Sequence, residues 1–231
     1  MQIPRYCLLC HQRSTLSFDL CQECYHDLPW LHSSCLRCGR LLISADKRCG
    51  ACLNKPPLFK LMLAPFNYQE PIVSLITQLK FYGCLTTARL LGHLMAEFLF
   101  NYYQNNPQRL PSYLVPVPLH KQRLKERGYN QALELARPIA KRLNLPIDHS
   151  TCQRVQATLP QSQLSAKHRY TNIKHAFTLD LIATHLLTTD SKIPLFIDDV
   201  ITTGSTITEM SRVFRQAGIT TIHVSCCART N

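Results

Sequence analysis

Two adjacent carboxylates stand at the point of this chain best suited to chemistry. Asp198 and Asp199 follow the uninterrupted apolar run 194–197, which is typical of a strand buried on both faces of a parallel sheet. Residues 200–206 after them are Val, Ile, Thr, Gly and Ser only, and a helical pattern begins at Ile207. Ligands bind at the carboxyl ends of the strands in open α/β sheets. We therefore expect a binding site where this strand passes into its helix.

The composition of this segment indicates a sugar phosphate as the ligand. Small residues let backbone N–H groups approach a phosphate, and the start of a helix adds partial positive charge. The two carboxylates would repel a phosphate alone, but they suit sugar hydroxyls or a nearby divalent cation. A ribose with a 5′-phosphate needs both halves. The alternative is a buried strand followed by an ordinary turn around Gly204; the segment differs from a P-loop because no Lys follows that glycine.

Eight of the twelve cysteines lie in the first 52 residues and could bind metal. They form four Cys-x-x-Cys pairs, of which the second two repeat the first two at a shift of 28 residues: Cys7/Cys10, Cys21/Cys24, Cys35/Cys38 and Cys49/Cys52. Two such pairs complete a tetrahedron around zinc, so the repeat predicts two structural Zn²⁺ ions. The ions could bind in two sequential ribbons, which we favour, or in an interleaved cross-brace.

A disulfide framework is the alternative for these cysteines. The chain opens with Met-Gln-Ile-Pro-Arg-Tyr and shows no charged segment followed by an apolar one, so a secretory signal peptide is not expected. We therefore expect a cytoplasmic protein with reduced thiols, which favours zinc over disulfides. No stretch of 18 apolar residues is present, so membrane insertion is not expected.

The run 196–206 resembles the phosphoribosyl pyrophosphate (PRPP) motif of type I phosphoribosyltransferases at every defining position. The resemblance implies that the two carboxylates hold the ribose hydroxyls and that residues 202–206 wrap the 5′-phosphate, with Mg²⁺ on the pyrophosphate. It assigns no catalytic residue. The residues it implies in PRPP binding are Asp198, Asp199, Val200, Ile201, Thr202, Thr203, Gly204, Ser205 and Thr206.

The elements of an α/β domain must position this site. Residues 1–55 form the cysteine module, and Pro56-Pro57 looks like a linker. Alternating strand and helix patterns in 56–231 indicate a twisted, mostly parallel sheet flanked by helices, while the polar segment 151–177 is interpreted as a lid-like loop. Besides the strand that ends at the carboxylates, we expect strands over 61–68, 112–119 and 220–228, and helices over 71–83, 86–103, 131–143 (capped by Asn130 and kinked at Pro138) and 207–216.

The formal net charge of +12 and pI of about 9.3 suit a polyanionic partner. Residues 121–142 carry seven Lys or Arg against two acids. Within them, Arg123, Lys125 and Arg127 follow a strand end, near the expected position of Asp198. These cations could bind the pyrophosphate of PRPP, contact DNA phosphates or form a solvated basic face.

Four further side chains are candidates for the same site. Lys80 follows an apolar helix face and could reach the phosphate or lie on the surface. His120 could act as a general acid or base at its strand end, or simply cap the strand. Lys167 and Arg169 lie in the lid-like segment. They could cover bound PRPP, as lid residues can do in type I transferases.

The order of motifs along nearly the whole chain resembles the competence protein F (ComF) family. After the double cysteine module come segments 64–68, 79–83, 116–120 and 127–131, followed by the PRPP motif. The resemblance implies a zinc-ribbon domain fused to a type I phosphoribosyltransferase fold, and a role in natural transformation, in which single-stranded DNA enters the cytoplasm. It also implies association with a helicase-type DNA translocase and with DNA-processing proteins of recombination.

Two functions are consistent with these observations. The first, which we favour, is an accessory protein that handles incoming single-stranded DNA and binds PRPP as a ligand. The second is an active Mg²⁺-dependent phosphoribosyltransferase that acts on an unidentified base or nucleotide. Nothing in the sequence identifies an acceptor pocket, and a fold alone does not establish an activity.

Overall fold

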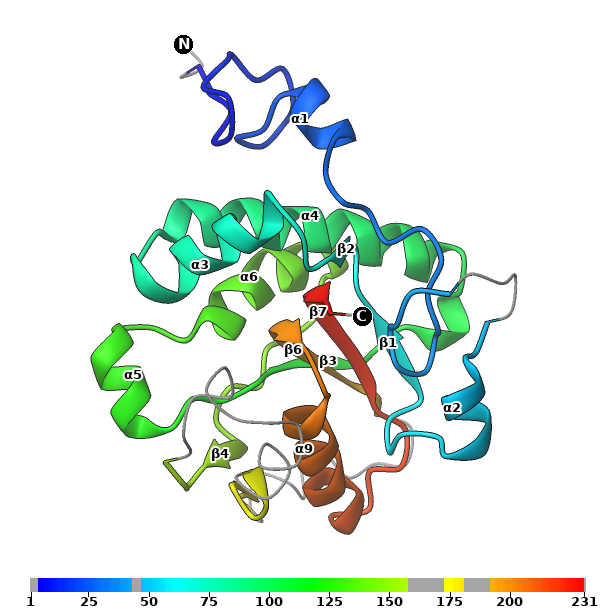
Figure 1. The fold of residues 1–231 in the computed structure, drawn as a ribbon. Helices are drawn as coiled ribbons and strands as arrows, with labels where there is room; N and C mark the ends of the chain where they lie inside the picture. The colour runs from blue at the N-terminus through cyan, green and yellow to red at the C-terminus, as the bar shows by residue number, and fades with distance from the viewer. Residues whose placement is uncertain (1–3, 43–46, 158–172, 181–191, 231) are drawn as a thin grey trace.

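The computed structural model describes residues 4–42, 47–157, 173–180 and 192–230 (Figure 1). Within these residues it shows an α/β domain with a sheet of five strands, to which a cysteine-rich N-terminal module is attached. The expected fold class is therefore confirmed. The elements are α1 Gln22–His26, α2 Gly50–Asn54, β1 Leu61–Leu63, β2 Phe66–Asn67, α3 Ile72–Phe81, α4 Leu85–Gln104, the 3₁₀ turn η1 Pro107–Arg109, β3 Tyr113–Pro116, α5 Lys121–Arg127, α6 Gln131–Leu143, β4 Cys152–Arg154, β5 Phe177–Leu179, β6 Pro194–Ile201, α9 Ser205–Gln216 and β7 His223–Arg229.

The sheet has the strand order β1-β7-β6-β3, with β2 pairing further along β7, and all of its pairings are parallel. β6 lies between β3 and β7, and its residues 194–197 are fully buried, as the apolar run predicts. The strand continues past the carboxylates to Ile201, beyond the expected end. The reason is that its pairing with β7 persists, with Val200 opposite Ala228 and Ile201 opposite Arg229.

Helices cover both faces of the sheet (Figure 1). Alternate residues of a strand point to opposite faces, and β6 follows this rule. Leu195 and Ile197 join the hydrophobic cluster built by α3, α4 and α6, whereas Phe196 packs with Phe214 of α9 at a ring-centroid distance of 4.8 Å. The close contact between α4 and α6 requires a glycine, since a Cβ at Gly92 would lie 2.9 Å from Cγ of Pro138. Pro138, which was predicted to kink this helix, lies inside α6, and the helix continues beyond it to Leu143.

The local helix signals of residues 56–231 were mostly correct, but α5 was missed, as were the short helices α1 and α2 of the cysteine module. Asn130 caps α6 as expected, because its side-chain Oδ1 accepts a hydrogen bond from Ala132 N at 3.0 Å. The charged segment Lys121–Arg127, for which no element was predicted, forms α5 and ends at Gly128 with a φ of 82°. An apolar periodicity is absent there because none of the residues of α5 is buried.

Two short strands lie at the ends of the segment 151–177, whose role as a lid-like loop stays a prediction. β4 and β5 pair as an antiparallel ribbon, with Cys152 opposite Leu179. Both of these side chains are buried in the cluster beneath α9, which holds β4 and β5 against the domain despite the polar composition of the segment. The candidates Lys167 and Arg169 lie outside the described residues.

The cysteine module packs on the α/β domain through apolar side chains. Leu20 and Leu28 belong to the same buried cluster as the leucines of α4. The ring of Trp30 packs at a tilt against that of Phe66, with a centroid distance of 4.6 Å. The predicted division at residues 55 and 56 stays a prediction. None of the described helices combines the length and hydropathy needed to cross a membrane.

Candidate functional site

The eight N-terminal cysteines gather into two groups of four, in sequential order. Within each group, the sulfur atoms lie within 4.8 Å of one another. The Sγ atoms of Cys10 and Cys21 are 3.6 Å apart, as are those of Cys38 and Cys49. A zinc tetrahedron with bonds of about 2.3 Å places its sulfurs roughly 3.8 Å apart. Both groups therefore fit structural zinc, the sequential arrangement is confirmed and the interleaved alternative is wrong. We call Cys7, Cys10, Cys21 and Cys24 the first ribbon site, and Cys35, Cys38, Cys49 and Cys52 the second.

The backbone around each site prepares one thiol for metal binding. Leu9 N donates to Cys7 Sγ at 3.4 Å, and Cys49 N donates to Cys35 Sγ at 3.3 Å. Burial opposes the ionisation of these thiols, but the surrounding N–H donors outweigh it and lower the pKa of Cys7 to about 6 and that of Cys35 to about 7. Because the thiolate is the metal ligand, this environment favours zinc.

Towards the carboxyl end of β6, Asp199 forms an ion pair with a lysine of helix α3. Lys80 lies in the last turn of α3, and its Nζ is 2.9 Å from Oδ1 of Asp199. Only 5% of the Asp199 side chain and 25% of the Lys80 side chain are exposed. Burial would lower the pKa of Lys80, but the charge of Asp199 and its hydrogen bond raise it overall. Lys80 thus lies beside the carboxylates and is not a freely exposed surface lysine.

Asp198 is poised between its two protonation states. Burial is the main reason that its pKa is raised to about 7, and the neighbouring Asp199 adds to the shift. The cations Lys80 and Arg154 act in the opposite direction. Hydroxyl donors or a metal ion next to Asp198 would favour the ionised form and bring this pKa down.

One oxygen of Asp199 has no hydrogen-bond partner among the described residues. Oδ1 pairs with Lys80 and accepts from Val200 N at 2.6 Å, whereas the buried Oδ2 is unsatisfied. A buried polar atom without a partner costs about 1–3 kcal/mol, more when it is charged, so such atoms are uncommon unless a ligand or water completes them. The arrangement suits a hydroxyl group or a hydrated cation as the missing partner.

The turn after β6 has the backbone shape expected for an anion site. Gly204 adopts a φ of 77°, which is why a residue without Cβ stands there, and α9 begins directly after it. The hydroxyl oxygens of Thr203 and Ser205 are 2.7 Å apart on the same turn. The turn therefore combines the N-terminus of a twelve-residue helix with two hydroxyl side chains.

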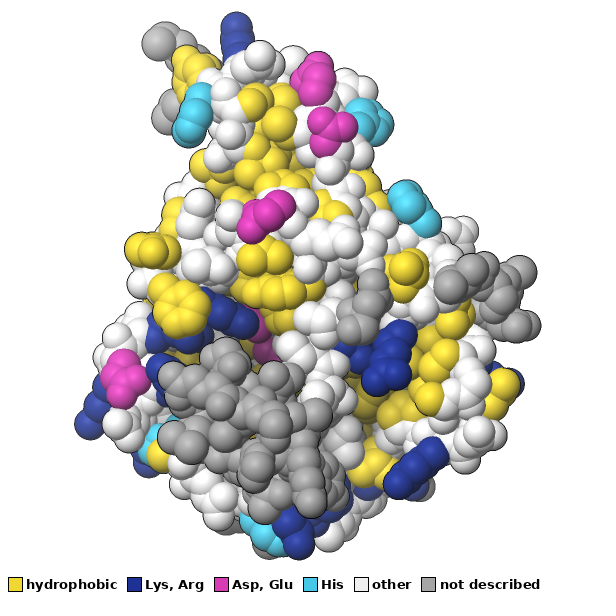
Figure 2. Space-filling view, in the orientation of Figure 1, with side chains coloured by type: hydrophobic (Ala, Val, Ile, Leu, Met, Phe, Trp, Pro, Cys, Tyr) yellow, Lys and Arg dark blue, Asp and Glu magenta, His cyan; other side chains and the backbone are white. Residues whose placement is uncertain are grey.

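Two arginines interact electrostatically with the carboxylates. Burial lowers the pKa of Arg127, and the charge of Asp199 partly offsets this effect, which places the candidate Arg127 near the motif site. Arg154 of β4 stands in the same relation to Asp198. We did not assign Arg154 to the site from the sequence, since its closeness depends on β4 bridging His120. In Figure 2, an acidic side chain is visible in a recess beside Lys and Arg side chains.

The other predicted cations lie further out. Arg123 forms an exposed ion pair with Glu126 at 3.5 Å, and its charge contributes to lowering the pKa of Arg127. Lys125 is exposed on α5. His120 caps α5, because its Nδ1 accepts a hydrogen bond from Gln122 N at 3.3 Å. Of the two roles considered for His120, general acid or base and structural cap, the structure shows a cap. His120 caps the start of helix α5, however, and not the end of a strand.

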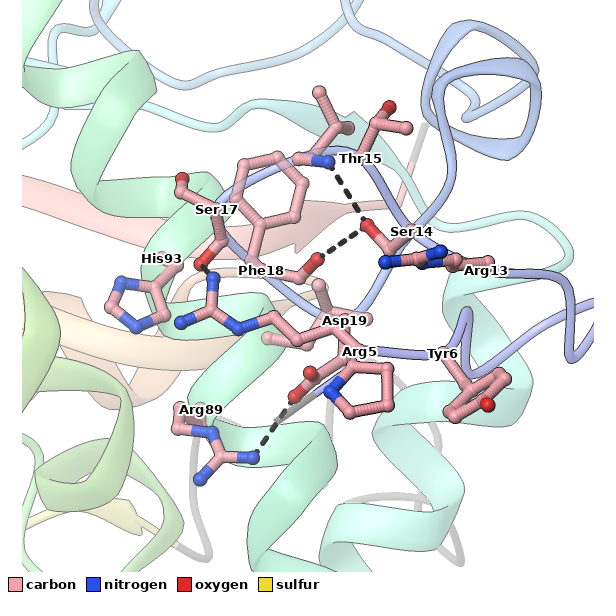
Figure 3. A pocket seen from close by; sticks show the side chains of 13 residues that line it. Arg5, Tyr6, Arg13, Ser14, Thr15, Ser17, Phe18, Asp19, Arg89 and His93 are labelled. Carbon is pink, nitrogen blue, oxygen red and sulfur yellow. Dashed lines mark hydrogen bonds and ion pairs between the residues drawn. The ribbon is translucent and has the colours of Figure 1, made fainter. Parts of the chain in front are cut away.

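A second feature is a cleft between the first ribbon and α4, with a volume of about 1020 Å³ (Figure 3). We call it the basic cleft. Three arginines line it against one acid: Arg5, Arg13 and Arg89 against Asp19. The Arg89–Asp19 ion pair, 2.9 Å long, connects the ribbon to the helix. Hydroxyl side chains and the exposed ring of Tyr6 complete the lining.

Comparison with known proteins identifies the family. A family model described as a double zinc ribbon domain matches residues 2–53. DNA utilization protein YhgH of Salmonella typhimurium is 33% identical over 231 residues, covering 100% of this chain and 99% of the relative. Competence protein F of Haemophilus influenzae is 34% identical over 209 residues, covering 90% of this chain and 88% of the relative. The chain belongs to the competence protein F family.

Membership of the competence protein F family confirms the resemblance seen in the order of the sequence motifs, and the matched ribbon domain agrees with the two cysteine sites. DNA utilization protein YhgH of Escherichia coli K12 is also similar to this chain, with 31% identity over 231 residues. Among solved structures, a hypoxanthine phosphoribosyl transferase of Trypanosoma cruzi aligns with 60% of this chain and 63% of its own, with a TM-score of 0.35 and 11% identity.

Proposed function

We propose that this protein binds PRPP with Mg²⁺ at the carboxyl end of β6 and handles single-stranded DNA in the cytoplasm. The observation that carries the PRPP site is the buried, unsatisfied Oδ2 of Asp199, a carboxylate that pairs with Lys80 through its other oxygen and lies on the strand that leads into the Gly204 turn. The names of the relatives, DNA utilization protein and competence protein, support the DNA role. A helicase-type translocase and recombination proteins are the partners that we propose for it.

Each part of the ligand has a matching part of the site. Asp198 and Asp199 would accept hydrogen bonds from the two ribose hydroxyls, and Mg²⁺ would neutralise the pyrophosphate. Backbone N–H groups after Gly204 and the N-terminus of α9 would hold the 5′-phosphate. Lys80, which pairs with Asp199, and Arg127 supply positive charge near the two carboxylates.

Calorimetry with PRPP and Mg²⁺ tests this site. The double substitution Asp198→Asn/Asp199→Asn should weaken binding at least about 100-fold, because neutral amides cannot replace two charge-assisted acceptors. Asp27→Asn, which changes an exposed aspartate of the first ribbon, should leave the affinity unchanged.

In the wild type, the affinity for PRPP should fall as the pH drops through about 7, since the raised pKa of Asp198 means that its carboxylate is protonated below that value. Equal affinity for the double variant would refute the site.

The alternative of an active transferase is decided by the products. Cations beside the pyrophosphate would stabilise its departure while the ribose develops positive charge, which is the electrostatic requirement of the reaction. Pyrophosphate release from PRPP, measured against a panel of bases and nucleic acids, would establish such an activity and name its acceptor.

The basic cleft is our candidate for the DNA contact. Its arginines can pair with phosphates, and the exposed Tyr6 offers a ring on which a base could stack, a contact worth about 1–3 kcal/mol. The charged face of α5 is the competing location. The basic cleft and α5 can be compared directly, because two positive charges can be removed from either location by substitution.

Binding of a single-stranded oligonucleotide across a salt series makes this comparison. Arg5→Gln/Arg13→Gln should reduce the slope of log affinity against log salt by about 1.4, since each phosphate contact to a single strand contributes roughly 0.7. Lys121→Gln/Lys125→Gln, on α5, removes the same charge and should change the slope much less. A larger effect of the α5 variant would move the DNA site to α5, and no binding at low salt would eliminate the DNA role.

A further inference from the structure

A buried arginine at the end of β7 lies between the second ribbon site and the motif turn. Arg229 is only 3% exposed. Its Nε donates to the carbonyl oxygen of Cys38 at 2.9 Å. Its Nη1 donates to the carbonyl oxygen of Ile201 at 2.8 Å and also to that of Thr202. A single guanidinium group thus joins a zinc-ligating loop to the first residues of the turn that we propose for phosphate binding.

The second ribbon is held tightly where this bridge begins. Gly39, next to Cys38, has a φ of 71°, and a Cβ at that position would lie 2.7 Å from Sδ of Met62. Met62 N in turn donates to the carbonyl of Leu36 at 2.9 Å. Met62 belongs to β1, so the ribbon is packed directly on the strand that pairs with β7. The loop around Cys38 therefore has little freedom to move without moving Arg229.

Charge gives the bridge a second physical basis. Burying a guanidinium is costly unless hydrogen bonds and opposite charge compensate it, and Arg229 is only 3% exposed. Four thiolates around one Zn²⁺ carry a net charge of −2, so a loaded second ribbon would stabilise the buried cation. Groups of this kind around a metal site commonly orient its ligands. Loss of the metal would remove this charge balance and loosen the loop that contains Cys38.

The first ribbon provides a natural control within the same chain. It has the same ligands and spacing as the second ribbon, but it docks on α4, where Arg89 with a 61% exposed side chain pairs with Asp19. Metal in the first ribbon should therefore have much less influence on the motif turn.

We propose that zinc in the second ribbon and PRPP in the motif site bind with positive cooperativity, and that Arg229 is the positioning residue that couples them. The inference rests on the proposed function and extends it to regulation. With metal bound, the Cys38 loop fixes Arg229, and Arg229 fixes the carbonyls of Ile201 and Thr202 so that the following N–H groups are set for phosphate. Such coupling is reciprocal and typically amounts to about 5–150-fold. PRPP should therefore also retain zinc in the second ribbon.

Thiol alkylation in the presence of a zinc chelator tests this reciprocity on the wild-type protein. The rate is followed by mass spectrometry separately for peptides of the first ribbon and of the second. Saturating PRPP with Mg²⁺ should slow alkylation of Cys35, Cys38, Cys49 and Cys52 at least about fivefold. The rate at the first ribbon should change less than twofold. Equal rates at the second ribbon with and without PRPP, once calorimetry has shown that PRPP binds, would overturn the coupling; absence of PRPP binding would refute the proposed function instead.

Two variants complete the experiment. Arg229→Lys keeps the charge but cannot reach the same carbonyls, so PRPP should no longer protect the second ribbon and should bind at least about fivefold more weakly. Full protection in this variant would show that Arg229 is not the connection. Asp198→Asn/Asp199→Asn should show no protection by PRPP, and protection there would mean that the added compound acts on the chelator. If Arg229→Lys does not fold, the wild-type alkylation rates still decide whether the sites are coupled.

Discussion

Replacing Lys80 by methionine should lower the free energy of unfolding of this protein by about 3 kcal/mol at pH 7.5. The substitution retains most of the side-chain volume but leaves the carboxylate of Asp199 buried without its cation. Removing one partner of a buried ion pair typically costs 3–5 kcal/mol, and the low end applies here because a quarter of the Lys80 side chain is exposed. Urea unfolding followed by circular dichroism measures the change.

A double substitution separates charge from packing in this experiment. Lys80→Met/Asp199→Asn removes both charges and should recover most of the lost stability, since an amide is far less costly to bury than an unpaired carboxylate. Lys125→Met, on the exposed face of α5, is the matched control and should change stability by less than about 0.5 kcal/mol. A loss below this limit for Lys80→Met would show that the pair contributes little to the fold.

Removal of zinc should unfold the cysteine module. Structural zinc contributes apparent binding free energies of about 10 kcal/mol or more in zinc-finger peptides, and that energy is folding energy in small domains. The helices within this module, α1 and α2, are five residues long, too short to be stable alone. The single tryptophan, Trp30, reports the unfolding of the module, because its indole N–H donates to the carbonyl oxygen of Tyr25 at 2.9 Å and its ring packs near Phe66. We expect its fluorescence to shift to the red after chelation.

Elemental analysis should accompany this measurement and find two zinc ions per chain before chelation. Adding Zn²⁺ back under reducing conditions should restore the fluorescence, and adding Mg²⁺ should not. A metal content of zero or one, or an unchanged Trp30 spectrum after complete loss of zinc, would contradict the assignment of two structural sites.

Features that depend on neighbouring residues could be predicted from the sequence. The buried strand before Asp198, the start of a helix soon after Gly204 and the capping of α6 by Asn130 all follow from local chemistry, and the structure contains each of them. The Cys-x-x-Cys spacing likewise identified the metal ligands. The helix α5 was missed because a helix with no buried residue leaves no apolar periodicity.

The sequence by itself determined the residue types at each site and the local backbone that presents them, since capping, turn geometry and knuckle spacing act over a few positions. Only the tertiary structure decided which distant groups complete those sites. Lys80 reaches Asp199 because α3 ends beside β6, and Arg154 approaches Asp198 because β4 bridges His120. Arg229 connects two loops through hydrogen bonds that span 191 positions to Cys38 and 28 to Ile201. Contacts of this range depend on parallel pairing and packing of the whole sheet, which no local pattern encodes.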